Sequence, residues 1–297
     1  MTGYSAIDLS RLPAPAVIET LDTEATIAAI RAKVLELAPE LGPALALESE
    51  PAVKLIEALA FFGVLHRARV NDAARAVMLA TATGADLDNL AALLGVSRLT
   101  LVAADPEAIP PVPAVMEADA DLRTRTQLAL EGFSTAGPRG AYLFHALTAS
   151  GEVLDASVVS PAPGKVLVTV LSRTGSGGAS AALINTVAAA LNDEDVRPLC
   201  DEVIVQGAII LPYSVSASLR CFSGPDTAAV LAAAETAVRA YVADSHRLGR
   251  ALRRSGLFAA LHQPGVEQVT LTEPAADIEP TTGEATWCAA INLSQTP

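Results

Sequence analysis

The chain has 297 residues, of which 51% are apolar but only 4% aromatic, and its net charge is −13. This length predicts two or three modules, and the acidic balance argues against a general nucleic-acid or anionic-membrane binder. Three isolated cysteines, Cys200, Cys221 and Cys288, predict no disulfide framework and no zinc site, which suggests a reducing compartment. We see no signal-peptide pattern and no apolar run long enough to span a membrane.

The first 20 residues are expected to be extended, because Pro13 and Pro15 cannot lie inside a helix. They contain a short apolar arm, made of Leu12, Val17 and Ile18. This arm docks either on its own domain or on a neighbouring subunit.

Residues Thr23–Ala38 have the spacing of an amphipathic helix, capped by Asp22 or Thr23 and ended by Pro39 and Gly42-Pro43. Its apolar face is predicted to hold Ile27, Ile30, Val34 and Leu37.

The next helix is predicted to be long, because no proline interrupts residues 53 to about 82. Ser49 is the expected N-cap, and Gly84 the expected end. A shorter helix then begins with Asp86 as its cap and ends at Gly95.

Apolar residues recur along this long helix at Val53, Ile56, Leu59 and Phe62, over a wide arc. A helix so apolar requires partners. Asn71 and Asp72 either fix the register of a helical bundle, as buried polar residues can, or are solvated surface residues.

Residues 98–118 contain Pro106, Pro110, Pro111 and Pro113, which predicts an extended linker or an exposed loop and marks a first domain boundary. Within this segment, Leu99–Val102 could form a short strand.

Residues 119–210 read as a middle module with the order α–β–β–α–β, a small sheet with helices on one face. The inward residues of its first helix are predicted to include Leu122, Thr126 and Leu130. The expected elements are helices Asp119–Leu130, Pro138–Ser150 and Ala179–Leu191, and strands Val153–Val159, Lys165–Leu171 and Asp201–Ile210.

Residues 211–297 predict a second small module of β–α–α–β–β order. Strict alternation over Tyr213–Cys221 indicates a half-buried strand. The other expected elements are a helix ending at Val242 with Val230, Ala234, Val238 and Tyr241 packed inward, a helix Leu252–Leu261, and strands Val266–Leu271 and Thr286–Leu293. The predicted fold class is therefore α+β: an N-terminal helical region, 1–97, then the linker and two α+β modules.

Motifs of catalysis or cofactor binding are not apparent. The run Arg173–Gly178 lacks the lysine and spacing of a phosphate-binding loop, which favours a flexible turn. Asn192–Asp195 is either a cation site or, more simply, a solvated turn. The four histidines, His66, His145, His246 and His262, match no metal or catalytic motif. We therefore predict no cofactor, no metal and no enzymatic activity.

Five arginines cluster late in the chain and face only Asp244 in that segment, whereas residues 105–131 are rich in acids. They are Arg239, Arg247, Arg250, Arg253 and Arg254. Such patches suit docking between subunits, because the guanidinium pairs bidentately with carboxylates. Ordinary helix-surface arginines are the alternative, and a nucleic-acid patch is disfavoured by the overall charge.

Several blocks together resemble one family, the baseplate J-like proteins of contractile-tailed phages. The blocks extend over nearly the whole chain: Glu48–Ala60, Arg69–Ala80, Thr83–Ala91, Glu131–Tyr142, Ala189–Leu199, His246–Arg250 and Val266–Asp277. The resemblance implies a structural wedge component of a virion or injection-particle baseplate, assembled in the bacterial cytoplasm. Two copies would join a third wedge protein through an N-terminal helical bundle, and C-terminal regions would link wedges around the hub.

The partners implied are other wedge proteins and a second copy, and indirectly hub and sheath, with neither nucleic acid nor membrane. The alternative function is a binding module or cell-wall-active enzyme of the same tail, against which the lack of a paired carboxylate motif weighs. The candidate interface residues are Leu12, Val17, Ile18, Val53, Ile56, Leu59, Phe62, Asn71, Asp72, Arg247, Arg250, Arg253 and Arg254.

Overall fold

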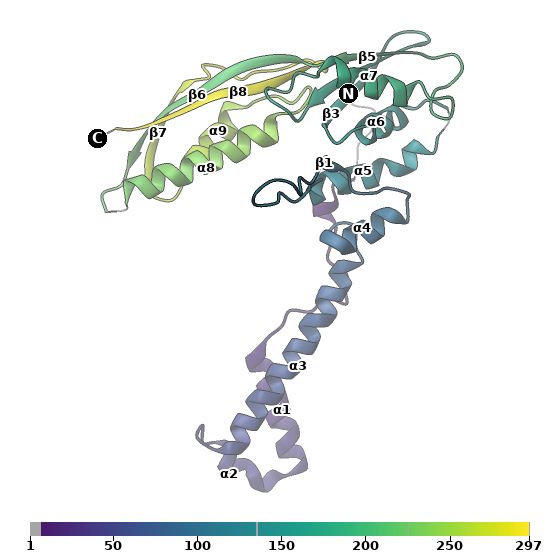
Figure 1. The fold of residues 1–297 in the computed structure, drawn as a ribbon. Helices are drawn as coiled ribbons and strands as arrows, with labels where there is room; N and C mark the ends of the chain where they lie inside the picture. Colours follow the sequence, from purple (N-terminus) through teal and green to yellow (C-terminus); the bar gives the residue numbers. More distant parts are fainter. Residues whose placement is uncertain (1–6, 135, 225, 297) are drawn as a thin grey trace. The chain divides into compact units, whose positions relative to one another are not determined.

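The computed structural model describes residues 7–134, 136–224 and 226–296. The chain divides into two compact units, Ala6–Ser97 and Arg98–Pro297, which we call the helical unit and the sheet unit (Figure 1). The helical unit contains only helices among its described elements, and the sheet unit combines helices with three small sheets. The predicted α+β class is therefore confirmed.

The helical unit is a short helical hairpin followed by one more helix. Its elements are η1 (Leu9–Arg11), α1 (Thr23–Leu37), η2 (Pro39–Leu41), α2 (Gly42–Leu45), α3 (Pro51–Ala76) and α4 (Gly84–Ala92). Asp22 caps α1 as predicted, and its carboxylate accepts a hydrogen bond from the N–H of Ala25 at 3.0 Å.

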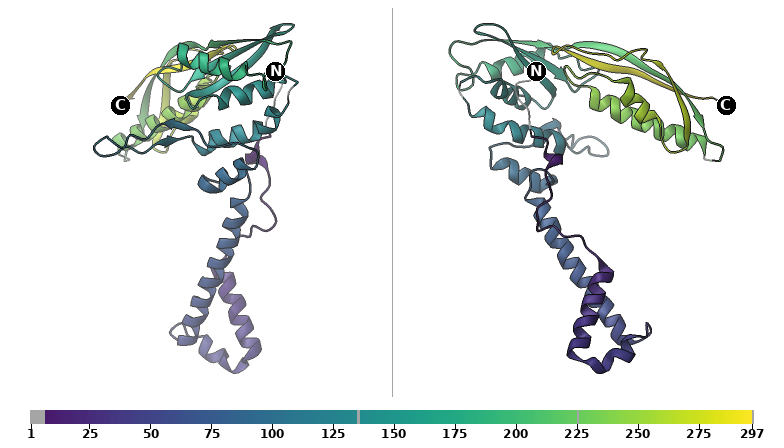
Figure 2. Two further views of the ribbon diagram at one scale, coloured as in Figure 1. Left: turned by 45° about the vertical axis from the view of Figure 1, so that its right-hand side comes forward. Right: turned by 180° about the vertical axis from the view of Figure 1, so that it is seen from behind.

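Helix α1 packs against the first half of α3, and the two run side by side in both views of Figure 2. Ile27, Ile30 and Val34 of α1 contact a small buried core that contains Val53 and Ile56 of α3. The fourth residue predicted for this face, Leu37, is exposed. It lies at the last position of α1, where the chain turns away into η2.

Helix α3 is shorter than predicted, because it ends at Ala76 rather than near residue 82. The hydroxyl of Thr81 donates to the carbonyl of Arg75 at 2.7 Å, which satisfies one of the carbonyls that a helix end leaves free. Its N-cap is Glu50 and not Ser49, with Pro51 in the first position.

Gly84 does not end the long helix but begins α4, whose N-cap is Thr83 and not Asp86. The end of α4 is as predicted. Gly95 has φ +73°, and the next residue, Val96, donates its N–H to the carbonyl of Ala91, which is the usual glycine-terminated closure of a helix.

Residues 98–118 are more ordered than the predicted linker. Strands β1 (Thr100–Val102) and β2 (Val115–Met116) pair antiparallel, and a further bridge joins Asp105 to Val112. The short strand predicted at 99–102 is confirmed, but its partner lies within the proline-rich segment, where we expected no strand.

The middle module places helices on a three-stranded sheet of order β3-β4-β5, with β3 antiparallel and β5 parallel to β4. Leu122 and Thr126 of its first helix are buried as predicted, whereas Leu130 is exposed. The elements are α5 (Asp119–Gly132), α6 (Arg139–Thr148), β3 (Val153–Ala162), β4 (Lys165–Ser172), α7 (Ala181–Leu191) and β5 (Glu202–Gly207).

The C-terminal module packs α8 and α9 on one face of a sheet of order β7-β6-β8 (Figure 1). Ile209 and Ile210 pair with Glu284 and Ala285, so they belong to this sheet and not to the preceding strand as we predicted. The elements are β6 (Ile209–Cys221), α8 (Thr227–Ser245), α9 (Arg254–Leu261), β7 (Val266–Glu273) and β8 (Glu284–Thr296).

Candidate assembly surfaces

Two of the interface residues predicted on α3 face the interior of their own unit. Val53 and Ile56 are buried against α1. A partner could reach them only if this core opened. In this structure they hold α1 on α3.

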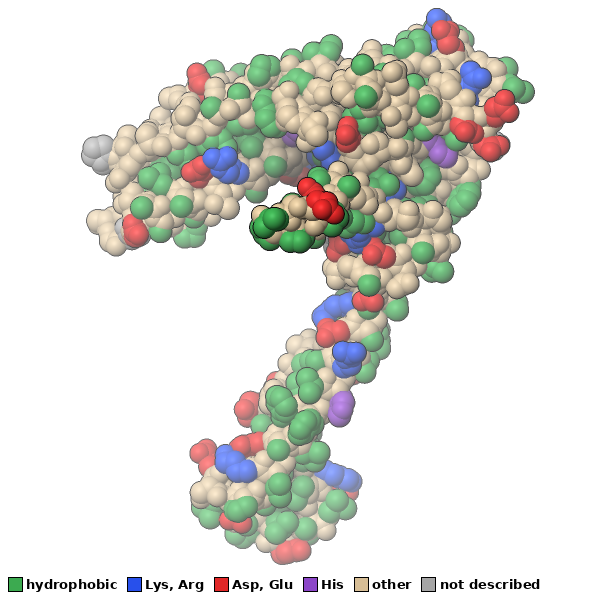
Figure 3. Space-filling model, viewed as in Figure 1, with side chains coloured by type: hydrophobic (Ala, Val, Ile, Leu, Met, Phe, Trp, Pro, Cys, Tyr) green, Lys and Arg blue, Asp and Glu red, His purple; other side chains and the backbone are tan. Residues whose placement is uncertain are grey.

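The opposite side of α3 remains apolar and exposed. Leu59 and Phe62 are 60% and 55% exposed. We call Leu55, Leu59, Phe61, Phe62 and Leu65 the outer face of α3, since all five are exposed large apolar residues. Hydrophobic side chains are visible along this helix in Figure 3. Soluble proteins rarely leave a contiguous apolar patch of this kind uncovered.

The N-terminal arm is tied to the second half of α3 by a polar clamp. The buried Asn71 accepts a hydrogen bond from the N–H of Glu19 at 3.1 Å and donates to the carbonyl of the same residue at 2.8 Å. Arg67 pairs with the carboxylate of Glu19. Asn71 thus holds the arm of its own chain, whereas the adjacent Asp72 is exposed and pairs with Arg75.

The apolar residues of the arm are only partly covered by this docking. Leu12 and Val17 are exposed, and Ile18 is half-buried. The arm is therefore held on its own unit at Glu19, through both its backbone and its side chain, while Leu12 and Val17 are exposed.

The arginine cluster meets several acids that lie elsewhere in the sequence. Arg253 pairs with Asp277 at 3.1 Å and with Glu279 at 2.6 Å. The N–H of Arg254 and the guanidinium of Arg253 lower the pKa of Asp277 below its usual range. Arg250 pairs with Asp244.

Of the four predicted arginines, Arg247 has the loosest ion pair. Its Nη2 lies 4.0 Å from Asp121, a carboxylate that Arg173 already holds at 2.7 Å. Arg254 is committed within the chain: it donates to the carbonyl of Leu271 and lies over the ring of Phe258. Because most of the cluster is paired internally, it is less of a free positive patch than the sequence suggested.

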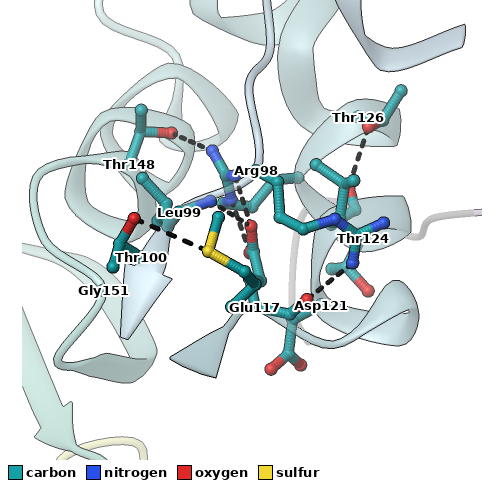
Figure 4. A network of polar contacts seen from close by, with 12 residues as sticks. Arg98, Leu99, Thr100, Glu117, Asp121, Thr124, Thr126, Thr148 and Gly151 are labelled. Carbon is teal, nitrogen blue, oxygen red and sulfur yellow. Dashed lines mark hydrogen bonds and ion pairs between the residues drawn. The ribbon is translucent and has the colours of Figure 1, made fainter. Parts of the chain in front are cut away.

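A buried ion pair organises the start of the sheet unit (Figure 4). Glu117 accepts hydrogen bonds from Nε and Nη2 of Arg125 at 2.8 and 2.6 Å, and from the N–H of Leu99 at 3.1 Å. Arg98 donates to the carbonyl of Glu117 and pairs with Asp119 at 2.7 Å. Sequence reasoning missed this network, since Glu117 appeared only as one of many acids near the prolines.

The glycine-rich run and the acidic turn both have structural explanations. Gly177 has φ +99°, and a Cβ there would lie 2.8 Å from Nε2 of His246, so the turn lets the middle module approach the C-terminal one. Within Asn192–Asp195, Asp193 caps the N–H of Asp195 at 3.0 Å. Across the described residues, no group of three or more His, Cys, Asp or Glu could hold a metal ion.

Two further facts limit the possible sites. All three cysteines lie in the described part of the chain and are free. None of the described helices is both long and apolar enough to cross a membrane.

Comparison with known proteins identifies the family. Three family models match in chain order: the baseplate J-like N-terminal domain at residues 48–105, the central domain at 134–207 and the C-terminal domain at 213–294. Baseplate protein J of Escherichia phage P2 is 48% identical over 287 residues, which cover 95% of this chain and 95% of that protein. The chain belongs to the baseplate J-like family.

A solved structure, the 6-fold symmetrised cryo-EM structure of the anti-feeding prophage baseplate, aligns at a TM-score of 0.42 with 16% identity. The alignment covers 61% of this chain and 44% of that one, and it is too weak to support more. Membership of the baseplate J-like family makes the chain a structural component of a phage baseplate, and the resemblance noted in the sequence is confirmed. The first family match, 48–105, includes all of α3 and α4.

Proposed function

We propose that this baseplate J-like chain is a wedge component of a contractile tail, and that the outer face of α3 binds a second copy and another wedge protein in a helical bundle. The observation that carries the proposal is the distribution of apolar residues around α3. Val53, Ile56 and Ala60 are buried on one side, while Leu59 and Phe62 are exposed on the other. A helix that is apolar on both sides is stable in water only when both sides are covered.

The contacts of the arm extend this proposal. Leu12 and Val17 are exposed residues of the same helical unit that would form the bundle, so they add apolar surface for the same partners. We propose Arg247, with its loose ion pair, as the predicted arginine best able to contact another subunit. The wedges would be linked through such contacts around the tail hub, in particles that assemble in the bacterial cytoplasm.

The proposal keeps the segments inferred from the sequence as functional parts. Residues 1–97 would form the bundle, residues 98–118 would join it to the rest, and the modules 119–210 and 211–297 would make the other wedge contacts. Family membership favours a structural role over catalysis. Clearing of a cell-wall substrate by the purified chain would contradict this and support the alternative of a cell-wall-active enzyme.

The test uses the Leu59→Asp, Phe62→Asp double variant. Because both residues are exposed, the variant should keep its fold, but charges at these positions would be costly to bury in a bundle. The wild-type chain and the variant are each co-expressed with the neighbouring genes, and the complexes are measured by light scattering on a sizing column.

We expect a complex with two copies of the wild-type chain and one partner, and its loss in the variant. Leu199→Asp is the matched control, since Leu199 is a fully exposed leucine in the sheet unit. If the double variant assembles as the wild type does, the outer face of α3 is not the bundle contact.

A further inference from the structure

A groove of about 500 Å³ follows β8 along the edge that faces away from β6, beyond the bridge that joins Ala285 to Leu248. Five consecutive residues of this strand, 287–291, line it, opposite Val242 and Ala243 of α8 and beside Leu154 of β3. Successive side chains of a strand point to opposite faces, so five consecutive lining residues place the groove at the strand edge. Its walls are mainly apolar, with Trp287 and Ile291 as the largest β8 side chains.

The charged groups of the groove carry one sign. Arg239 and Arg247 line it, and no carboxylate is among the residues that line it in the described chain. Arg239 pairs with Glu235 one turn away on α8. This ion pair is exposed, so it contributes little to stability and Arg239 can leave it for another carboxylate. Arg247 lies 4.0 Å from its nearest carboxylate. The groove therefore suits an apolar segment that brings its own acids.

The sheet unit presents such a segment between β1 and β2. Hydrogen bonds of 2.9 Å in both directions join Asp105 and Val112 and close residues 105–112 into what we call the hairpin tip. Ile109 is 99% exposed and Val112 is also exposed, while Asp105 and Glu107 place two acids beside them. None of these eight residues lines the groove of its own chain.

The tip also has a defined shape before any partner binds. The carboxylate of Asp105 accepts hydrogen bonds from the N–H groups of Glu107 and Ala108 at 3.1 and 3.2 Å, and two prolines follow Ile109. A preorganised loop loses little conformational entropy on binding, which favours its use as a docking element.

We propose that the hairpin tip of one copy inserts into the β8 groove of a second copy. Ile109 and Val112 would meet the apolar walls, and Asp105 and Glu107 would approach Arg239 and Arg247. This contact deepens the proposed function and rests on it for the presence of more than one copy. It joins two different surfaces, so repeated contacts of this kind close into a ring if the geometry allows.

Charge favours the hairpin tip over a second β8 strand as the segment that binds in the groove. From Ala285 to Thr296 the strand carries no charged residue, so a second β8 would bring only the carboxylate of its first residue, Glu284, which already accepts the N–H of Thr281 at 2.7 Å. The hairpin tip supplies both the apolar side chains and the acids.

The decisive experiment is complementation between two full-length variants, both carrying Leu59→Asp and Phe62→Asp to remove the α3 contact. One has Ile109→Arg, which spoils the tip but keeps the groove. The other has Ala290→Trp, which fills the groove at an exposed position but keeps the tip. Sedimentation velocity is measured on each alone and on the mixture over a range of concentrations.

We expect each variant to be monomeric and the mixture to form a one-to-one dimer. A mixture that sediments as two monomers, and whose cysteine variants give no selective crosslink, would overturn the proposal. Disulfide trapping would detect a contact too weak to sediment as a dimer. In a mixture of Ile109→Cys and Ala290→Cys chains, these two positions should crosslink to each other more than either does to the exposed native Cys200. Equal yields would contradict insertion of the tip.

The outcomes separate this inference from the wedge proposal. If the wild-type chain binds its neighbours through α3 but the two variants fail to complement, the tip contact is wrong and the wedge proposal stands. If the variants complement while no neighbour binds, the tip contact stands and the wedge proposal fails.

Discussion

Arg125 donates two hydrogen bonds to the carboxylate of Glu117, and the two side chains are only 4% and 2% exposed. This pair joins α5 to the segment that follows β2, and the same carboxylate also accepts the N–H of Leu99. Breaking a buried pair by removing one partner leaves an uncompensated charge, which costs much more than an exposed pair contributes.

We therefore predict that Glu117→Ala destabilises the sheet unit by about 3 to 5 kcal/mol. Urea denaturation followed by circular dichroism would measure the change. The control is Glu36→Ala, which removes an exposed pair with Lys33 and should cost less than about 1 kcal/mol. Similar losses in the two variants would show that burial of the Glu117 pair is not what matters.

A second prediction concerns the clamp between Asn71 and the arm. Asn71→Ala removes both hydrogen bonds to Glu19 and should release residues 12–20 without melting α3, because alanine favours helix. Amide hydrogen exchange should become faster in the arm and stay slow in α1 and α3. Asp72→Ala, at the exposed neighbouring position, should leave the exchange of the arm unchanged.

The glycine-rich turn gives a matched pair of substitutions. Gly177→Ala would force a side chain onto a backbone with φ +99° and bring its Cβ within 2.7 Å of Leu171 and 2.8 Å of His246, so we expect clear destabilisation, on the order of 1–3 kcal/mol. Gly178→Ala meets nothing within 4 Å and should be neutral or slightly stabilising. Thermal unfolding of both variants tests this, and equal melting temperatures would contradict the close approach at Gly177.

Asp155 should make stability depend on pH in an unusual direction. Burial raises the pKa of its carboxyl, although the N–H groups of Leu248 and Ala156 and the nearby Arg247 oppose the rise. The folded state therefore keeps this proton to higher pH than the unfolded state. The contribution of Asp155 to the free energy of unfolding should fall as pH rises from about 4, the ordinary aspartate pKa, through the raised value.

The measurement is the difference in unfolding free energy between the wild type and Asp155→Ala, taken by urea denaturation at several pH values between about 4 and 7. The difference should shrink as the pH rises. Asp277→Ala is the control: its pKa is lowered, so its stabilising contribution is fully present above the ordinary pKa and should stay constant across this pH range, being lost only as pH falls below about 4 through the lowered value. A flat profile for Asp155 would show that its pKa is not raised.

Local signals predicted the local structure well. Asp22 capped its helix, Gly95 ended α4, and the alternation at Tyr213–Cys221 marked β6, because each depends on neighbours in the sequence. The prediction that one strand continues to Ile210 was wrong, because Ile209 pairs with Glu284, a residue distant in the sequence that no local pattern indicates.

The candidate surfaces show the same limit. The helical period of α3 identified its apolar positions but not which side α1 would cover, so Val53 and Ile56 were grouped with Leu59 and Phe62. The arginine cluster looked unpaired, because Asp277 and Asp121 reach Arg253 and Arg247 only through the folded sheet unit.

The pairing of β6 with β8 has a consequence for the order in which the chain becomes structured. The pairing of β6 with β8 cannot form until β8 is present, and β8 follows two helices and β7 in the chain. In contrast, α1 and α3 meet across one short connection. Contacts distant in sequence form slowly, and helical contacts form fast. The helical unit should therefore fold first, which would offer its outer face to partners while the C-terminal sheet is still forming.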